Sequence, residues 1–185
     1  MIKINLTDLE SAPLFGLVLA GGKSTRMKQD KALLKYHGKS QVEHCYELLN
    51  TFCDRAFVSC RPNQWQNQNA NDLTQIHDLE TLTGIGPMGG ILSAMEQHPK
   101  AAWLVIACDL PFLTESAILN LIENRDTSKV GTCYSSTSDG MPEPLCAIYE
   151  PSAKDALYKY YNLNKYCPRK VFLNSEVRIL KPISD

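Results

Sequence analysis

The sequence predicts a single α/β domain with a mostly parallel sheet. Two short apolar runs, Phe15–Leu19 and Trp103–Cys108, are typical of buried strands, and a stretch with helical periodicity, 41–52, lies between them. The chain has 185 residues and shows neither a repeat nor a shift in composition. Alternating strand and helix patterns of this kind favour a parallel, Rossmann-like sheet, so we expect one domain over residues 1–185.

The remaining elements follow from apolar periodicity and from turn residues. In the first expected helix, His44 is expected at the surface or the core edge rather than as a ligand. Residues 1–13 are expected to form a loosely ordered lead-in. Expected strands lie at 15–19, 56–60, 73–77, 103–108, 129–134 and 144–149, with a late one within 171–179. Expected helices lie at 41–52, 91–97, from 114–115 onward, and at 155–161.

Composition excludes several classes of function. A net charge of −1 gives no overall attraction to nucleic acid or to an anionic membrane. No apolar run approaches the roughly 18 residues that a membrane span needs. The seven cysteines are scattered, odd in number and without a C-x-x-C pair, and the first residues lack the order of a targeting segment. We therefore expect reduced thiols in a cytoplasmic protein.

A glycine turn follows the first strand and organises the rest of the chain. It consists of Leu19, Ala20, Gly21 and Gly22, and the hydroxyl of Ser24 and the cations Arg26 and Lys31 come after it. Oriented backbone amides and cations both favour anions, so this stretch predicts a polyphosphate cradle. The alternative is an ordinary glycine turn with solvated basic residues.

A P-loop is the nearest competing motif. Gly22-Lys23-Ser24 matches the end of G-x-x-x-x-G-K-[ST], but position 17, where the first glycine belongs, is Leu17. Gly16 misses that position by one residue. A P-loop GTP-binding protein that hydrolyses nucleotide is therefore a secondary hypothesis.

Polar side chains follow three further strands. Ser59 and Arg61 end the second strand, Asp78 follows the third, and Asp109 follows the most apolar strand. Ligands gather at the carboxyl ends of parallel strands, and Mg²⁺ prefers carboxylate oxygens. Simpler interpretations are strand-end polarity for Ser59 and a turn cap for Asp78, and a Walker-B aspartate would resemble Asp109.

A glycine-rich segment, 83–90, is expected to form a flexible loop that opens the helix at 91–97. A helix start approached by glycines suits an anion or the edge of a ligand. His37, His77 and His98 show no evident partner, which argues against a histidine base.

The stretch L-A-G-G-K-S-T-R-M-x-x-D-K-A-L-L resembles the signature of the MobA-like nucleotidyltransferases, most closely the molybdenum cofactor guanylyltransferases. The segment G-P-x-G-G-I resembles the second motif of that family. Lys28 departs from the pattern, because a glycine often follows the methionine there. Related cytidylyltransferases usually carry a second alanine where Gly21 stands, so Gly21 favours guanine.

The resemblance implies a three-layer domain of the nucleotide-diphospho-sugar transferase type. It also implies transfer of GMP from GTP to molybdopterin, with release of pyrophosphate and with Mg²⁺ as cofactor. Contact with other cofactor-biosynthesis proteins is a further expectation. Implied catalytic residues are Arg26, Lys31 and Asp109, with Asp109 as metal ligand; implied nucleotide-binding residues are Leu19, Ala20, Gly21, Gly22, Lys31, Ser59, Asp78 and Asp109.

Several alternatives stay open at this level. The same motifs serve a CTP:molybdopterin cytidylyltransferase or a sugar-phosphate nucleotidyltransferase. Glu143, near the expected acceptor region, is either a second acid at the site or a solvated turn acid. The family's final Asn-x-Asn-x-Pro segment has no counterpart here, so we expect a truncated or divergent end, and a non-catalytic binding module is a further alternative.

Overall fold

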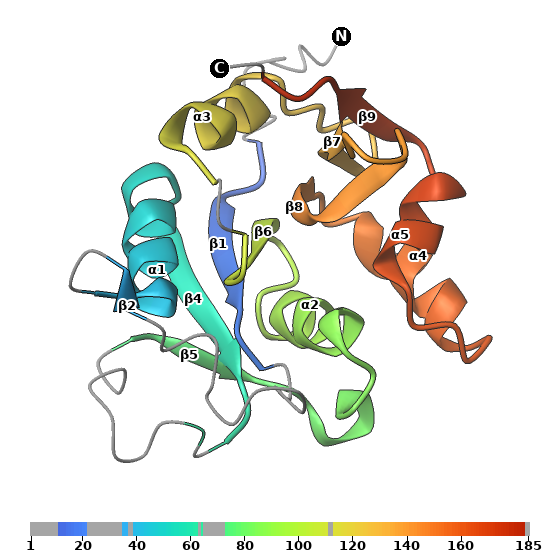
Figure 1. Ribbon diagram of the computed structural model, residues 1–185. Helices are drawn as coiled ribbons and strands as arrows, with labels where there is room; N and C mark the ends of the chain where they lie inside the picture. Colours follow the sequence, from blue (N-terminus) through green and yellow to red (C-terminus); the bar gives the residue numbers. More distant parts are fainter. Residues whose placement is uncertain are drawn as a thin grey trace, which may run out of the picture.

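The computed structural model describes residues 11–21, 35–36, 39–62, 64, 73–110 and 113–183. In these residues a seven-stranded sheet carries helices on both faces (Figure 1). The strands are β1 (Leu14–Leu19), β2 (Lys35–Tyr36), β3 (Lys39–Ser40), β4 (Arg55–Cys60), β5 (Gln75–His77), β6 (Ala102–Ala107), β7 (Gly131–Ser135), β8 (Pro142–Tyr149) and β9 (Val177–Leu180). The helices are α1 (Gln41–Phe52), the short 3₁₀ helix η3 (Glu80–Leu82), α2 (Pro87–Gln97), α3 (Glu115–Glu123), α4 (Ala153–Tyr161) and α5 (Pro168–Leu173).

The large sheet has the order β5-β4-β1-β6-β8-β7-β9, and β2 and β3 form a separate two-stranded hairpin. Strands β5, β4, β1 and β6 are mutually parallel. Strand β8 is antiparallel to both β6 and β7, and β9 is parallel to β7. The prediction of an α/β domain with a mostly parallel sheet is therefore confirmed, with an antiparallel strand inserted beside β6.

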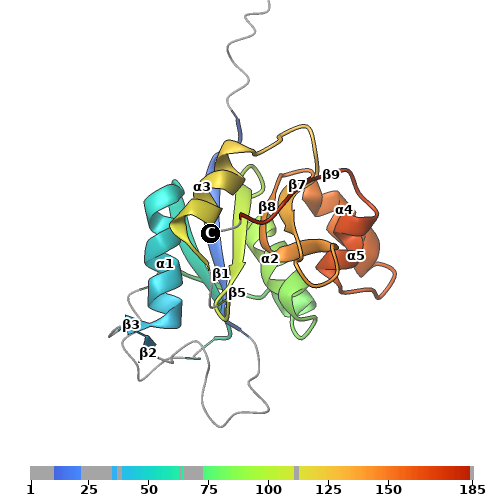
Figure 2. The ribbon, with the colours of Figure 1, turned by 45° about the horizontal axis from the view of Figure 1, so that its top comes forward.

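Two hydrophobic cores cover the two faces of the sheet and make three layers. Helices α1 and α3 lie on one face, and α2, α4 and α5 lie on the other (Figure 2). Every residue of β6 is buried, and its side chains alternate between the cores: Leu104 and Ile106 join the first, Trp103 and Val105 the second. A strand buried on both faces has a continuous apolar sequence, which is why the sequence identified it.

Helix α1 has the bounds that the periodicity predicts. It begins with a capping box, in which the Ser40 hydroxyl accepts from the Glu43 amide at 3.3 Å and the Glu43 carboxylate accepts from the Ser40 amide at 2.8 Å. Gly16 allows the helix to lie against β1, because a Cβ at that position would approach the Leu49 Cβ to 2.7 Å. His44 is exposed on this helix, as expected.

The expectation of a flexible loop up to residue 90 is wrong in its last part. Helix α2 begins at Pro87, so the paired glycines Gly89 and Gly90 are helical. Proline at the first helical position has a backbone angle that already suits the helix, and Gly86, with φ of 69°, makes the turn before it. Met88 is fully buried, so the first turn is also held by packing.

The second half of the chain departs from prediction at two places. Strand β8 begins at Pro142 rather than at 144; its pairing with β6 ends at Ile106–Cys146, so Pro144 faces no β6 partner that would need its missing N–H. The segment expected to contain a late strand, 171–179, does contain most of β9, but it is preceded by helix α5, which the sequence did not predict. The other predicted elements begin or end within a few residues of their expected bounds, whereas β2, β3 and η3 were not predicted.

A buried ion pair ties the start of the chain to the later strands. The Arg125 guanidinium donates to both carboxylate oxygens of Glu150, at 2.7 and 2.9 Å, and to the carbonyl of Ala12 at 3.1 Å. The two side chains are 12% and 3% exposed, so each charge depends on the other for compensation. The carbonyl of Pro13 also accepts from Ala102, whereas residues 1–10 lie outside the described residues.

We predict that Arg125→Met lowers the free energy of unfolding by about 3–5 kcal/mol, because it leaves the Glu150 carboxylate buried without a partner. Urea denaturation followed by circular dichroism measures the change. Lys129→Met, which breaks the exposed ion pair with Glu176, is the matched control and should change stability little. Equal losses in the two variants would contradict the assignment.

Candidate functional site

Three parallel strands end side by side at one edge of the sheet. Leu19, the last residue of β1, is in register with Ser59 on β4 and with Ala107 on β6. The ladder continues one step further, with the Ala20 amide donating to the Ser59 carbonyl at 2.9 Å and the Cys108 amide donating to the Leu19 carbonyl at 3.2 Å. The glycine turn after β1 and the turn at Cys108–Asp109 therefore leave the sheet at the same edge.

The bend after β1 is held against the end of β4. A Cβ at Gly21 would make only ordinary contacts with the backbone of Cys60 and Arg61, at 3.8 and 3.9 Å. The Gln64 side-chain amide donates to the Ala20 carbonyl at 2.9 Å, and its oxygen accepts from the Arg61 amide at 3.0 Å. Sequence reasoning missed Gln64, because it lies in a polar stretch where its neighbours are of the same type.

The first turn of α2 lies over the ends of β1 and β4. A Cβ at Gly90 would approach the Ser59 Oγ to 2.5 Å and the Leu19 Cδ2 to 3.0 Å. A side chain at position 90 would therefore require the Ser59 and Leu19 side chains, or the helix itself, to shift. Ser59 is only 4% exposed in consequence, and its hydroxyl faces the helix.

Asp78 follows β5 and lies against the same helix turn. Its Oδ2 is 3.3 Å from the place that a Cβ of Gly89 would occupy. The carboxylate is half-buried; burial raises its pKa above the ordinary aspartate value, and the charge of His77 opposes the shift. Asp78 therefore lies beside Gly89, and Ser59 and Leu19 lie beside the adjacent Gly90. A role for these residues in nucleotide binding stays a prediction.

Asp109 lies two residues beyond β6 and is exposed. Its charge reaches α1: burial raises the pKa of the Cys45 thiol to about 11, and the Asp109 carboxylate adds to the rise. Among the described residues, no three metal-ligating side chains are grouped to hold an ion. A lone exposed carboxylate still suits Mg²⁺, which is commonly held by one or two carboxylates together with substrate phosphates.

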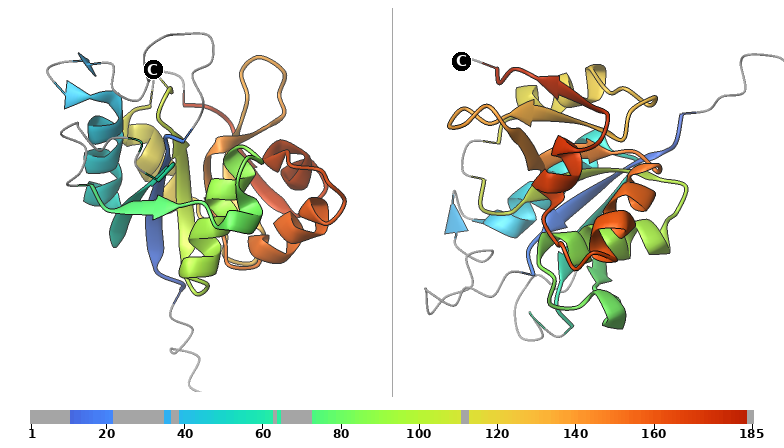
Figure 3. Two further views of the ribbon diagram at one scale, coloured as in Figure 1. Left: turned by 90° about the horizontal axis from the view of Figure 1, so that it is seen from below. Right: turned by 90° about the vertical axis from the view of Figure 1, so that its right-hand side faces the viewer.

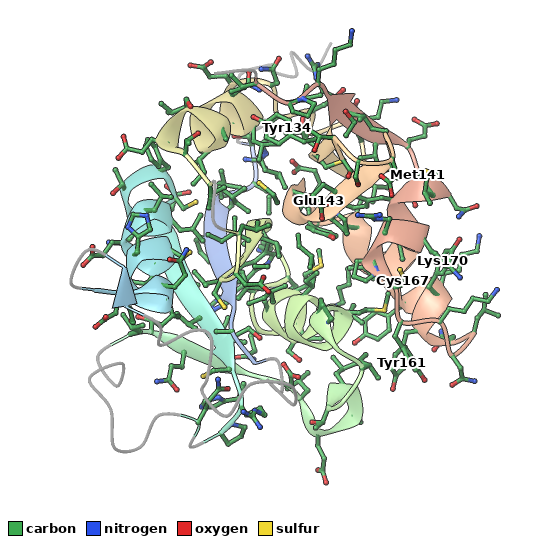
Figure 4. All side chains as sticks on the ribbon, viewed as in Figure 1. Tyr134, Met141, Glu143, Tyr161, Cys167 and Lys170 are labelled. Carbon is green, nitrogen blue, oxygen red and sulfur yellow. The ribbon has the colours of Figure 1, made fainter. Side chains whose placement is uncertain are left out.

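Not every predicted site residue can be placed. Gly22, Arg26 and Lys31 lie outside the described residues. Glu143 belongs to strand β8, so the interpretation as a solvated turn acid is wrong. It accepts from Arg169 at 3.2 Å, in the part of the molecule formed by β7, β8 and α5 (Figure 4).

Two histidines that seemed unpartnered in the sequence have defined surroundings. The His77 Nδ1 lies 3.1 Å from the Cys60 carbonyl; because a carbonyl only accepts, this nitrogen donates. His98 lies against the rings of Phe15, Phe57 and Trp103. His37 is outside the described residues. All seven cysteines are free thiols.

Among the described residues, no helix combines the length and the apolar character needed to cross a membrane.

The parallel strands, the covering helices and the polar edge define a nucleotidyltransferase-type α/β domain. The chain belongs to the MobA-like NTP transferase domain family, whose model matches residues 16–177. The family resemblance seen in the motifs is thus confirmed, and residues 16–177 form a domain of the nucleotidyltransferase type.

Named relatives carry the comparison further. The chain is 39% identical over 179 residues to the "Molybdenum cofactor biosynthesis bifunctional protein" of Synechocystis, covering 95% of this chain and 50% of that protein. It is 30% identical over 143 residues to the "Probable molybdenum cofactor guanylyltransferase" of Clostridium perfringens, covering 77% of this chain and 68% of the relative. The chain therefore spans about half the length of the Synechocystis protein.

Solved structures share the fold. The molybdopterin-guanine dinucleotide biosynthesis protein A of Archaeoglobus fulgidus superposes with a TM-score of 0.73 at 23% identity, covering 90% of this chain and 83% of that one. At this identity the likeness establishes the arrangement of strands and helices. It agrees with the three-layer architecture predicted from the sequence.

We predict that Asp78→Asn raises the melting temperature at neutral pH. The folded-state pKa lies above that of the unfolded chain, so the ionised carboxylate costs stability, and the cost disappears as the pH falls through the folded pKa. The gain should therefore shrink in acid, as differential scanning calorimetry across pH would show.

Asp126→Asn is the control of opposite sign. Hydrogen bonds from Ser128 lower the pKa of Asp126, so its ionised form contributes stability above the unfolded-state pKa. This variant should lose stability at neutral pH. A melting temperature that falls equally in both variants would contradict the burial cost assigned to Asp78.

Proposed function

We propose that this protein transfers GMP from GTP to molybdopterin, with release of pyrophosphate. The observation that carries the proposal is the register of β1 between β4 and β6, which brings the glycine turn and Asp109 to one edge of the sheet. The names of the relatives from Synechocystis and Clostridium perfringens support the same assignment.

The chemistry requires positioning and charge neutralisation more than covalent help. A molybdopterin phosphate attacks the α-phosphorus of GTP in line, the bond to the β-phosphate oxygen breaks, and pyrophosphate leaves. Charge accumulates on the phosphoryl oxygens during the step, so fixed cations and oriented amides accelerate it. The nucleophile is already a phosphate anion at neutral pH, so the step needs no general base.

Each predicted residue has a place in this scheme. The backbone from Leu19 to Gly22 seats the nucleotide, Arg26 and Lys31 neutralise the triphosphate, and Lys31 acts on the transition state. Ser59 and Asp78 lie on the nucleotide side, where a carboxylate can accept from the adjacent ring N–H and NH₂ of guanine. Asp78 is half-buried and lies against the first turn of α2. Partial burial suits a carboxylate that accepts from the neutral guanine ring.

A divalent cation fits the exposed carboxylate of Asp109. We propose that Asp109 holds Mg²⁺ together with the substrate phosphates. The bound ion would neutralise charge on the triphosphate and favour departure of pyrophosphate. The carboxylate can take this role, because it stands at the exposed turn after β6 and has solvent access.

Incubation with Mg²⁺, GTP and molybdopterin tests the proposal. Release of pyrophosphate coupled to loss of GTP is expected, and orthophosphate release would instead support the P-loop hypothesis. A thermal-shift panel of GTP, CTP, ATP and UTP, each with Mg²⁺, tests base preference, because a selective ligand raises the melting temperature by mass action. A shift with CTP alone would assign the chain to cytidylyl transfer.

We predict that Lys31→Ala and Asp109→Asn each lower turnover by about a hundredfold or more, because both remove charge stabilisation from the transition state. Initial rates of pyrophosphate release measure the effect. Asp155→Asn, which removes an exposed carboxylate on α4, is the matched control and should retain the wild-type rate. Near-wild-type turnover by both site variants would remove these assignments.

A further inference from the structure

Ser93 is a fully buried polar residue on the otherwise apolar buried side of α2. Its hydroxyl accepts a hydrogen bond at 2.9 Å from the backbone amide of Leu79, fourteen residues earlier in the chain. Leu79 directly follows Asp78, so this bond holds the peptide group that carries the Asp78 carbonyl. A buried hydroxyl usually forms a hydrogen bond within its own helix or with a neighbouring segment. Here its partner is the segment that follows β5.

Ser93 and Gly89 both lie against the Asp78–Leu79 segment from one face of the helix. They are four residues apart on α2, which places them one above the other. A Cβ at Gly89 would collide with the Leu82 carbonyl and would lie 3.3 Å from the Asp78 Oδ2, and Ser93 accepts from the next amide. One helix face thus borders the Asp78 side chain and binds the backbone amide that follows it.

Helix α2 is anchored independently of this contact. Glu96 accepts from Lys154 at 2.9 Å and from Tyr158 at 2.7 Å, which ties α2 to α4. Ile91 and Leu92 are fully buried in the core on this face of the sheet. Loss of the Ser93 hydroxyl would therefore leave the helix in place and remove one of the bonds that hold the Asp78–Leu79 segment, while the bond from Gln97 to the His77 carbonyl at 3.5 Å remains.

The Asp78–Leu79 segment lies at the surface of the molecule. Leu79 is 37% exposed, so the segment can shift outward without entering the core. The cost then falls on the orientation of Asp78 rather than on the fold.

We propose that Ser93 is a positioning residue that orients Asp78 toward the guanosine of GTP. The inference rests on the proposed function, because it takes Asp78 as the guanosine contact. Ser93 itself contacts no substrate; it acts through the backbone of Leu79. Ser93→Ala should weaken Mg·GTP binding about fivefold, the effect of losing one hydrogen bond that holds a recognition group.

A double-mutant cycle separates positioning from a general structural effect. Dissociation constants for Mg·GTP are measured by calorimetry for the wild type, Ser93→Ala, Asp78→Ala and the double variant. If Ser93 acts through Asp78, its change costs nothing further once Asp78 is gone. Thr132→Val is the matched control, because it removes a buried hydroxyl that accepts from the Asp126 amide at 3.1 Å, at the start of β7. It should leave GTP affinity unchanged in both backgrounds.

Two nucleotide analogues add a readout that a structural role would not move. Inosine triphosphate lacks the exocyclic amine of guanine, and 2′-deoxy-GTP lacks a ribose hydroxyl. Ser93→Ala should reduce the preference for GTP over whichever analogue lacks the group that Asp78 contacts, and Ser93→Thr, which keeps a hydroxyl, should restore it.

The outcomes divide cleanly. Loss of affinity by Ser93→Ala that is equal in the wild-type and Asp78→Ala backgrounds overturns the inference alone, as does an unchanged affinity in a wild type that binds GTP. A wild-type chain that does not bind Mg·GTP overturns the proposed function and this inference together.

Discussion

The hydrogen-bonded register of β1 between β4 and β6 is the constraint on which the site depends. Parallel pairing fixes Leu19 beside Ser59 and Ala107, and it thereby brings together three segments that are far apart in sequence. Both faces of this part of the sheet are buried, so a one-residue slip in register would exchange side chains between the two cores and disrupt the packing of both. Packing of the two cores therefore fixes the relative positions of the strand ends that form this edge.

Helix α2 converts this edge into a defined surface. Its two glycines allow close approach, Gly90 to Ser59 and Gly89 to the Leu82 carbonyl beside Asp78, and the burial of the helix keeps these contacts in place. The burial disfavours the ionised form of Asp78 and raises its pKa. Partial burial of this carboxylate lowers the stability of the fold. Groups with a pKa perturbed in this way are often found at functional sites.

The antiparallel strand β8 decides what lies on the other side of the site. Because β8 is antiparallel to β6, its first residues lie toward the edge where β6 ends. Helix α5 packs on β8 from the face of the sheet that α2 and α4 also cover (Figure 3). Glu143 and Arg169 form their ion pair in this region. The buried pair of Arg125 and Glu150 lies at the other end of β8 and joins this part to the start of β1.

The sequence by itself determined the fold class, the family and most element bounds, because these depend on local periodicity and on short motifs. The run at 103–108 and the amphipathic helix at 41–52 could be identified without any partner. Tertiary structure alone decided that the paired glycines Gly89 and Gly90 are helical, that Ser93 and Gln64 hold the segments around the site, and that Glu143 pairs with Arg169. These features depend on contacts between residues distant in the chain. The partner of a glycine or of an isolated polar side chain cannot be identified from the sequence alone.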